Sequence, residues 1–277
     1  VVIHDAAEFA SPVVAERLGV PHLTHSFGAL VPRDFVHSAG EEVASLWESL
    51  GLSPRPFGGS YDHLYLDIYP PALQPTYAGH VPRAQPLRPV AVDAAPGRQL
   101  PAHLRDLPSP VVYVTFGTVF NPAIVFAPVI EVARGLDATV IVTVGPDGDP
   151  DALGVVPSNV IVERYVPQSL LFDHCDVVVS HAGSGTFLSA LARAIPQLCL
   201  PQAADQFVNA SACERIGAGI TIEPAAVTAQ GIRDAIERLR TDEHFRRGAL
   251  TGAEAIHTMP PPDEVANMIE HLVDDNV

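Results

Sequence analysis

Residues 165–209 read YVPQSLLFDHCDVVVSHAGSGTFLSALARAIPQLCLPQAADQFVN. The middle of this stretch, residues 176–180, is a short apolar run of the kind that forms a buried strand. A glycine-rich segment, His-Ala-Gly-Ser-Gly-Thr at 181–186, follows at once, and an apolar, helix-forming run continues from 187 to 194. The pattern predicts a strand that enters a tight turn and then a helix, which is the local geometry of many anion-binding sites.

This turn has the chemistry of a phosphate site. The first N–H groups of a helix have no intrahelical partner, and the helix dipole adds roughly half a positive charge there. Gly183 and Gly185 would let a ligand approach the backbone, Ser184 and Thr186 add hydroxyl groups, and His181 adds a ring N–H. A plain turn between strand and helix is the alternative, because the spacing matches neither the dinucleotide fingerprint nor a Walker loop.

The surroundings of the turn make the interpretation more specific. Tyr-Val-Pro-Gln at 165–168 precedes it, Pro-Gln-Ala-Ala-Asp-Gln at 201–206 follows it, and Val-Val-Tyr-Val-Thr-Phe-Gly-Thr lies upstream at 111–118. In this order and spacing, the segments resemble the donor-site signature of GT-B nucleotide-sugar glycosyltransferases, in particular those that glycosylate antibiotics, macrolides and other natural products.

The resemblance implies an α/β fold with two Rossmann-like, doubly wound domains. Strand and helix patterns alternate from residue 110, as a parallel sheet covered on both faces requires. We expect a partial N-terminal acceptor-binding domain at 1–85, a linker at 86–109 within a Pro- and Gly-rich stretch, and a donor-binding domain at 110–277. By resemblance, the last helix would cross back to the N-terminal domain. The predicted strands of the donor domain are 111–116, 138–145, 160–163, 176–180, 197–200 and 219–222, and the predicted helices include 123–135, 185–194 and 205–216.

The chain opens on a predicted strand that ends at Asp5, followed by a helix at about 8–18. The resembled family has this passage late in its acceptor-binding domain, so we expect the sequence to be incomplete at its N-terminus. By the same resemblance, Asp5 orients a catalytic base, a histidine that lies in the absent sequence. A further helix is predicted at 39–50.

Composition restricts the other classes. The 277 residues carry a formal charge of −16, which argues against nucleic-acid binding, and no apolar run is long enough for a membrane span. The three cysteines lack metal-ligand spacing and suit reduced, buried thiols. We therefore expect a cytoplasmic protein without a cofactor. The acidic run at 147–151 is interpreted as a solvated loop, and no metal site is expected.

The donor contacts follow from the resemblance. The segment at Gly117 and Thr118 would meet the diphosphate, although Thr118 could instead cap a helix. Tyr165 would stack on the base, or else be a core aromatic, while Val166 and Gln168 read the edge of the base.

Asp205 and Gln206 would hydrogen-bond the donor sugar, with a helix N-cap as the alternative role of Asp205. His181 is the strongest catalytic candidate, because an N–H beside the diphosphate would stabilise the departing nucleotide. Ser189 stands where related enzymes that use UDP-sugars carry a glutamate on the ribose hydroxyls, which favours a dTDP-deoxysugar donor.

The sequence therefore predicts an inverting, metal-independent glycosyltransferase that moves a sugar from a dTDP- or UDP-sugar to a hydroxyl of an apolar natural product. Two alternatives remain open: a nucleotide-sugar-binding module without turnover, and a nucleotide-sugar 2-epimerase. The epimerase would need more carboxylates at the sugar than the single Asp205.

Overall fold

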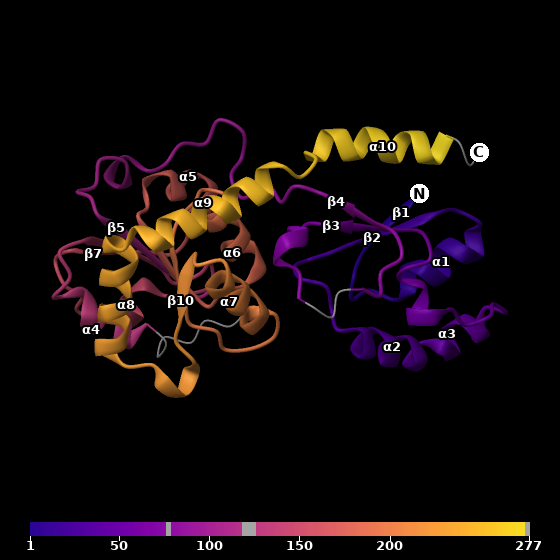
Figure 1. Cartoon of the computed structure of the whole chain (residues 1–277), viewed down its shortest axis with the longest axis horizontal. Helices are drawn as coiled ribbons and strands as arrows, with labels where there is room; N and C mark the ends of the chain where they lie inside the picture. Colours follow the sequence, from indigo (N-terminus) through magenta and orange to yellow (C-terminus); the bar gives the residue numbers. More distant parts are fainter. Residues whose placement is uncertain (76–78, 118–125, 275–277) are drawn as a thin grey trace. The chain divides into compact units, whose positions relative to one another are not determined.

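The computed structural model of the chain describes residues 1–75, 79–117 and 126–274 (Figure 1). The chain forms two compact units, Val1–Pro89 with Ala255–Val277, and Val90–Glu254. Each unit contains its own parallel sheet. None of the described helices is long and apolar enough to cross a membrane.

The first unit contains a four-stranded parallel sheet in the order β1-β2-β3-β4. Short helices connect its strands, and Tyr65, Tyr61 and Val36 are part of its core. The strands are β1 Val2–Asp5, β2 His22–His25, β3 Leu64–Asp67 and β4 Ala84–Pro86, and the helices are α1 Ala10–Leu18, α2 Arg33–Glu42, α3 Ala44–Ser49 and α10 Pro262–Asp274.

Two parts of this unit differ from the sequence prediction. The helix predicted at 39–50 is two helices: α2 begins at Arg33, after Pro32, and the break before α3 falls at Val43. Strands β3 and β4 were not predicted, because each is very short and both lie within or beside Pro- and Gly-rich sequence. Pro86 can end β4 because it has only one neighbouring strand, and a missing N–H is tolerated at a sheet edge.

Helix α10 belongs to the first unit although it comes last in the chain. Its Val265 is buried together with Leu66 of β3 and Leu87. The guanidinium of Arg88 donates to the carbonyl oxygens of His257, at 2.8 Å, and Met259, at 3.1 Å. These contacts fix the segment before α10 against the end of β4.

The second unit is a six-stranded parallel sheet in the order β10-β9-β8-β5-β6-β7. The chain therefore starts in the middle with β5, adds strands on one side, and returns to the other side at β8. Its strands are β5 Val111–Thr115, β6 Thr139–Thr143, β7 Val160–Glu163, β8 Val177–Ser180, β9 Gln197–Cys199 and β10 Gly219–Thr221; its helices are α4 Ala127–Ala133, α5 Gln168–Leu171, α6 Ser184–Leu191, α7 Gln206–Arg215, α8 Ala229–Thr241 and α9 Glu243–His257, which extends into the first unit.

Side chains of the central strands alternate between two cores, as the period of a strand requires. Val112 and Val114 of β5 face the core that α4 and α8 cover, with Ile232 and Ile236 among its members. Tyr113, between them, faces the other core, with Phe172 and Ala190. The sheet is thus buried on both faces, which explains its nearly uninterrupted valine runs.

The predicted strands of this unit are confirmed within two residues at their ends. Of the helix predicted at 123–135, residues 123–125 lie outside the described part, Phe126 is the N-cap, and α4 runs from Ala127 to Ala133. The order of the strands reverses between β5 and β8. In open α/β sheets, ligands bind outside the carboxyl ends of the strands at such a switch point.

Candidate functional site

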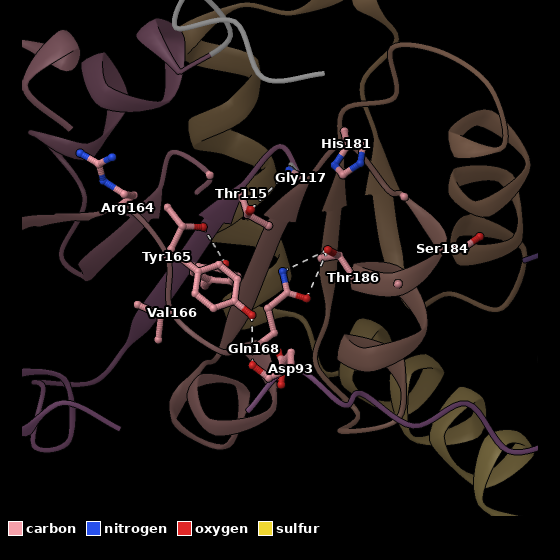
Figure 2. Close-up of a pocket in the computed structure, with 15 residues that line it drawn as sticks. Asp93, Thr115, Gly117, Arg164, Tyr165, Val166, Gln168, His181, Ser184 and Thr186 are labelled. Carbon is pink, nitrogen blue, oxygen red and sulfur yellow. Dashed lines mark hydrogen bonds between the residues drawn. The ribbon is translucent and has the colours of Figure 1, made fainter. Parts of the chain in front are cut away.

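A pocket of about 330 Å³ opens at this switch point, over the carboxyl ends of β5, β6 and β8 (Figure 2). Nine of the residues that the sequence singled out line it together, although they come from three separate segments of the chain. They are Gly117, Tyr165, Val166, Gln168, His181, Gly183, Ser184, Gly185 and Thr186. Thr118 lies outside the described residues.

The turn after β8 presents backbone N–H groups to the pocket. Ala182 has a left-handed φ of 62°, and Gly183 is the N-cap of α6 without a side-chain capping bond. Within the described part of the chain, no hydrogen bond engages the N–H groups of residues 184–186. The start of α6 is therefore a set of free donors with a favourable dipole, as an anion site requires.

The ring of His181 is packed between two glycines. A β-carbon on Gly117 would lie 2.8 Å from the His181 Cε1 atom, and one on Gly183 would lie 2.5 Å from Nε2. Burial lowers the pKa of His181 below its usual value, and the charge of Asp205 partly opposes this effect. The ring is thus predominantly neutral at pH 7, with one N–H to donate, and its buried Nδ1 has no partner among the described residues.

Tyr165 is 41% exposed, which does not fit the alternative of a core aromatic. Its hydroxyl donates to the carbonyl oxygen of Asp93 at 3.2 Å, and the carboxylate of Asp93 accepts from the N–H of Ser169 at 3.2 Å. The ring is therefore held at its hydroxyl end while a large part of its surface stays accessible. An exposed, anchored aromatic at a pocket is suited to stacking on a flat ligand.

Polar side chains form the floor of the pocket. The amide of Gln168 and the hydroxyl of Thr186 exchange hydrogen bonds, with Nε2 to Oγ1 at 3.1 Å. Tyr113 and Thr143 share a hydrogen bond of 2.7 Å between their hydroxyls. These groups are neutral and can adapt as donors or acceptors, so the floor is suited to a polar, uncharged part of a ligand.

Asp205 and Gln206 are not among the residues that line this pocket. The carboxylate of Asp205 accepts a 2.6 Å hydrogen bond from the hydroxyl of Ser184, and it makes no capping bond to α7. The Oε1 atom of Gln206 accepts from the N–H groups of Gln202 and Ala203, at 2.7 and 3.0 Å. Gln206 thus stabilises the loop before α7, and Asp205 connects to the pocket through Ser184.

Six further residues line the pocket and were missed in the sequence. Thr115, Thr143 and Gly145 end or follow a strand of the sheet, and inspection of every strand end would have found them. Asp93 gave no local signal, because it comes from the Pro-rich stretch before β5. The six are Asp93, Tyr113, Thr115, Thr143, Gly145 and Arg164.

Two other predictions concern residues outside the pocket. Asp5 ends β1 in the first unit and accepts a 2.8 Å hydrogen bond from the N–H of Ala7. In the acidic run, Asp149 accepts from the N–H of Asp151 at 3.1 Å, as a turn residue does. Within the described ranges, no group of three or more His, Cys, Asp or Glu side chains is arranged to hold a metal ion.

The fold is that of the GT-B glycosyltransferases: the spinosyn rhamnosyltransferase SpnG superposes on 97% of this chain with a TM-score of 0.82 at 27% identity. Residues 127–272 match the family described as erythromycin biosynthesis protein CIII-like, C-terminal domain. The chain belongs to this family.

Individual relatives agree with this assignment. The elloramycin glycosyltransferase ElmGT of Streptomyces olivaceus is 33% identical over 93% of this chain. The spinosyn rhamnosyltransferase SpnG, solved with thymidine diphosphate, is 28% identical with a TM-score of 0.83, over 97% of this chain and 72% of that one. Its structure with the spinosyn aglycone has the same TM-score at 27% identity and the same coverage. The chain spans 64% of the length of the elloramycin enzyme.

Proposed function

We propose that this chain is the donor-binding part, with a portion of the acceptor-binding part, of an inverting, metal-independent glycosyltransferase. The enzyme would transfer a deoxysugar from a dTDP-sugar to a hydroxyl group of a natural-product aglycone. The observation that carries the proposal is the combination of free N–H donors at the start of α6 with the ring of His181 beside them.

This combination is suited to a diphosphate leaving group. In the proposed reaction, the acceptor oxygen forms a bond to the anomeric carbon while the bond from that carbon to the diphosphate oxygen breaks. Negative charge then develops on the diphosphate, where the dipole of α6 and the N–H of His181 can stabilise it. The protein's own donors would thus take the role that a divalent cation has in other transferases.

The proton of the acceptor hydroxyl needs a base. His4 and His22 do not fit this role: both are buried, and their rings bond to each other with 3.1 Å between Nε2 of His4 and Nδ1 of His22. Asp5 is exposed, and only its Oδ1 atom is engaged by Ala7. By the resemblance, Asp5 stays the residue proposed to orient the base.

A thymidine nucleotide is the proposed donor for two reasons. Ser189, on the second turn of α6, offers no carboxylate to grip two ribose hydroxyls, and a deoxyribose lacks one of them. The related spinosyn enzyme was solved with thymidine diphosphate. The acceptor is proposed by class only, from one relative named for elloramycin and another solved with the spinosyn aglycone.

Calorimetric titration of the chain with dTDP and UDP, without added metal, tests the proposal. We expect micromolar dTDP binding that weakens about tenfold to a hundredfold in His181→Ala, because a charge-assisted hydrogen bond contributes about 1.5–3 kcal/mol. If the folded chain binds neither nucleotide, the proposed function is wrong. Equal binding by wild type and His181→Ala would remove His181 from the diphosphate site.

A further inference from the structure

Ser184 lines the pocket, but its hydroxyl is already committed. The Oγ atom donates to Asp205 Oδ2 at 2.6 Å, and the side chain is only 7% exposed. Figure 2 shows it directed away from His181 and Thr186. A hydroxyl has one proton, and the bond to a carboxylate is of the stronger, charge-assisted kind. Ser184 would have to break this bond to donate to a phosphate.

The side chain of Asn209, on α7, completes the arrangement. It is fully buried, and its Nδ2 atom lies 3.1 Å from Asp205 Oδ2, 2.9 Å from the carbonyl oxygen of Ala182 and 3.0 Å from Ser184 Oγ. The carboxylate and the carbonyl can only accept, so they take the two N–H groups of the amide. A flipped amide would turn its oxygen toward these two acceptors, and the orientation is therefore fixed.

This arrangement has a cost in stability. The Oδ1 atom of Asn209 is buried and has no hydrogen-bond partner among the described residues. An unsatisfied buried acceptor destabilises a fold, and an apolar side chain at this position would avoid it. The bonds of the amide nitrogen offset that cost, and they join α7 to the turn that carries His181.

We infer that Ser184 and Asn209 are positioning residues that hold one oxygen of Asp205, so that the other is presented to the hydroxyl groups of the donor sugar. The held oxygen is Oδ2; no hydrogen bond engages Oδ1 within the described part of the chain. The inference rests on the proposed function and on the prediction from the sequence that Asp205 hydrogen-bonds the donor sugar. It also reassigns Ser184: the diphosphate is bound by backbone N–H groups and His181, without the Ser184 hydroxyl.

The test separates the nucleotide from the sugar. Dissociation constants of the chain for dTDP, dTDP-glucose and dTDP-rhamnose are measured by calorimetry on wild type, Ser184→Ala, Asn209→Ala and Asp205→Ala. We expect dTDP affinity within about threefold of wild type in the first two variants. In each of these two variants, the ratio of the affinity for a dTDP-sugar to the affinity for dTDP should fall about tenfold. The double variant Ser184→Ala/Asp205→Ala loses no more than Asp205→Ala alone, because all three residues act through one carboxylate.

Two variants of α7 serve as matched controls. Ser211→Ala removes an exposed serine hydroxyl, and Cys213→Ala removes a buried side chain one turn beyond Asn209. Both should keep the affinity for dTDP and for its sugars. Where Asn209→Ala lowers the melting temperature too far for titration, Ser184→Ala carries the test.

Three results would overturn the inference. A tenfold loss of dTDP affinity in Ser184→Ala would make Ser184 a phosphate ligand. If the sugar adds as much affinity over dTDP in Ser184→Ala as in wild type, Ser184 does not position Asp205. No gain from either sugar in wild type would remove Asp205 from sugar binding. Failure of the folded wild type to bind dTDP at all contradicts the proposed function itself, and with it the inference.

Discussion

A β-carbon on Gly183 would lie 2.5 Å from Nε2 of His181, closer than side chains approach in folded proteins. Gly183 has an ordinary φ of −62°, so the clash with the ring is the whole effect of adding a methyl group there. We expect Gly183→Ala to destabilise the second unit by about 1–3 kcal/mol and to displace His181. Thermal unfolding checks this expectation.

Gly185, two residues further, is the matched control for Gly183→Ala. A β-carbon there meets nothing within 4 Å, and alanine is favoured over glycine in a helix by up to about 1 kcal/mol. Gly185→Ala should therefore keep or raise the melting temperature. Equal melting temperatures for the two variants would contradict the packing described around His181.

The same ring should link nucleotide binding to pH. Burial lowers the pKa of His181 in the free protein, and a bound diphosphate would stabilise the protonated ring and raise its pKa. Binding then takes up a proton, so dTDP affinity should increase as the pH falls from about 8 to about 6. The dTDP phosphate also titrates in this range. The pH dependence measured for His181→Gln, which lacks the imidazole, is therefore subtracted from that of the wild type. A wild type that parallels His181→Gln at every pH would show that His181 stays neutral in the complex.

The buried His22 should make the first unit sensitive to acid. Burial lowers its pKa to about 4, with further lowering by His63 and His4 and a weaker opposite effect of Glu16. Because this folded-state pKa lies below the unfolded value of about 6.5, the neutral ring's contribution is complete above that pH. As the pH falls from about 6.5 to about 4, the fold loses this contribution of His22 to its free energy of unfolding, which amounts to about 3 kcal/mol.

Fluorescence of Trp47 can measure this effect in urea, because Trp47 is the one tryptophan of the chain and is buried in the first unit. His22→Asn should flatten the pH dependence of the unfolding midpoint. His37→Asn, at a half-exposed position, should not. If the wild type and His22→Asn lose stability in parallel, other groups carry the acid sensitivity.

Ser189→Glu tests the argument for the nucleotide. A carboxylate at this position of α6 could accept hydrogen bonds from two ribose hydroxyls of UDP. The deoxyribose of dTDP lacks one of these hydroxyls, so UDP would gain more affinity than dTDP. We expect the ratio of UDP to dTDP affinity to increase about tenfold in competition titrations. An unchanged ratio would contradict the ribose argument, and Ser189→Gln controls for the size of the side chain.

The sequence was most informative for features that a pattern of neighbouring residues specifies. The strands of the second unit are buried on both faces, so their valine runs suffice to locate them. The turn at 181–186 and the aromatic Tyr165 can also be predicted from a few consecutive residues. The two short strands β3 and β4 have no such signal, because three or four residues beside prolines are too few to show a period.

Side-chain direction was not predictable in the same way. Whether Ser184 faces a phosphate or a carboxylate depends on Asp205, the N-cap of α7, and on Asn209 within α7, both more than twenty residues away in the sequence. The Oε1 atom of Gln206, a residue expected at the sugar, accepts from the N–H groups of its own loop. Such choices are set by tertiary hydrogen bonds, which no local pattern specifies.

The contact between Asp93 and Tyr165 has a consequence for chimeric enzymes. One way to graft the second unit onto a foreign first unit is to join the chains just before β5, the first strand of the second unit's sheet. A junction there would replace Asp93, which holds both the Tyr165 hydroxyl and the Ser169 N–H. A crossover at residue 90 would carry this native anchor into the hybrid, together with the shape of the pocket that Tyr165 lines.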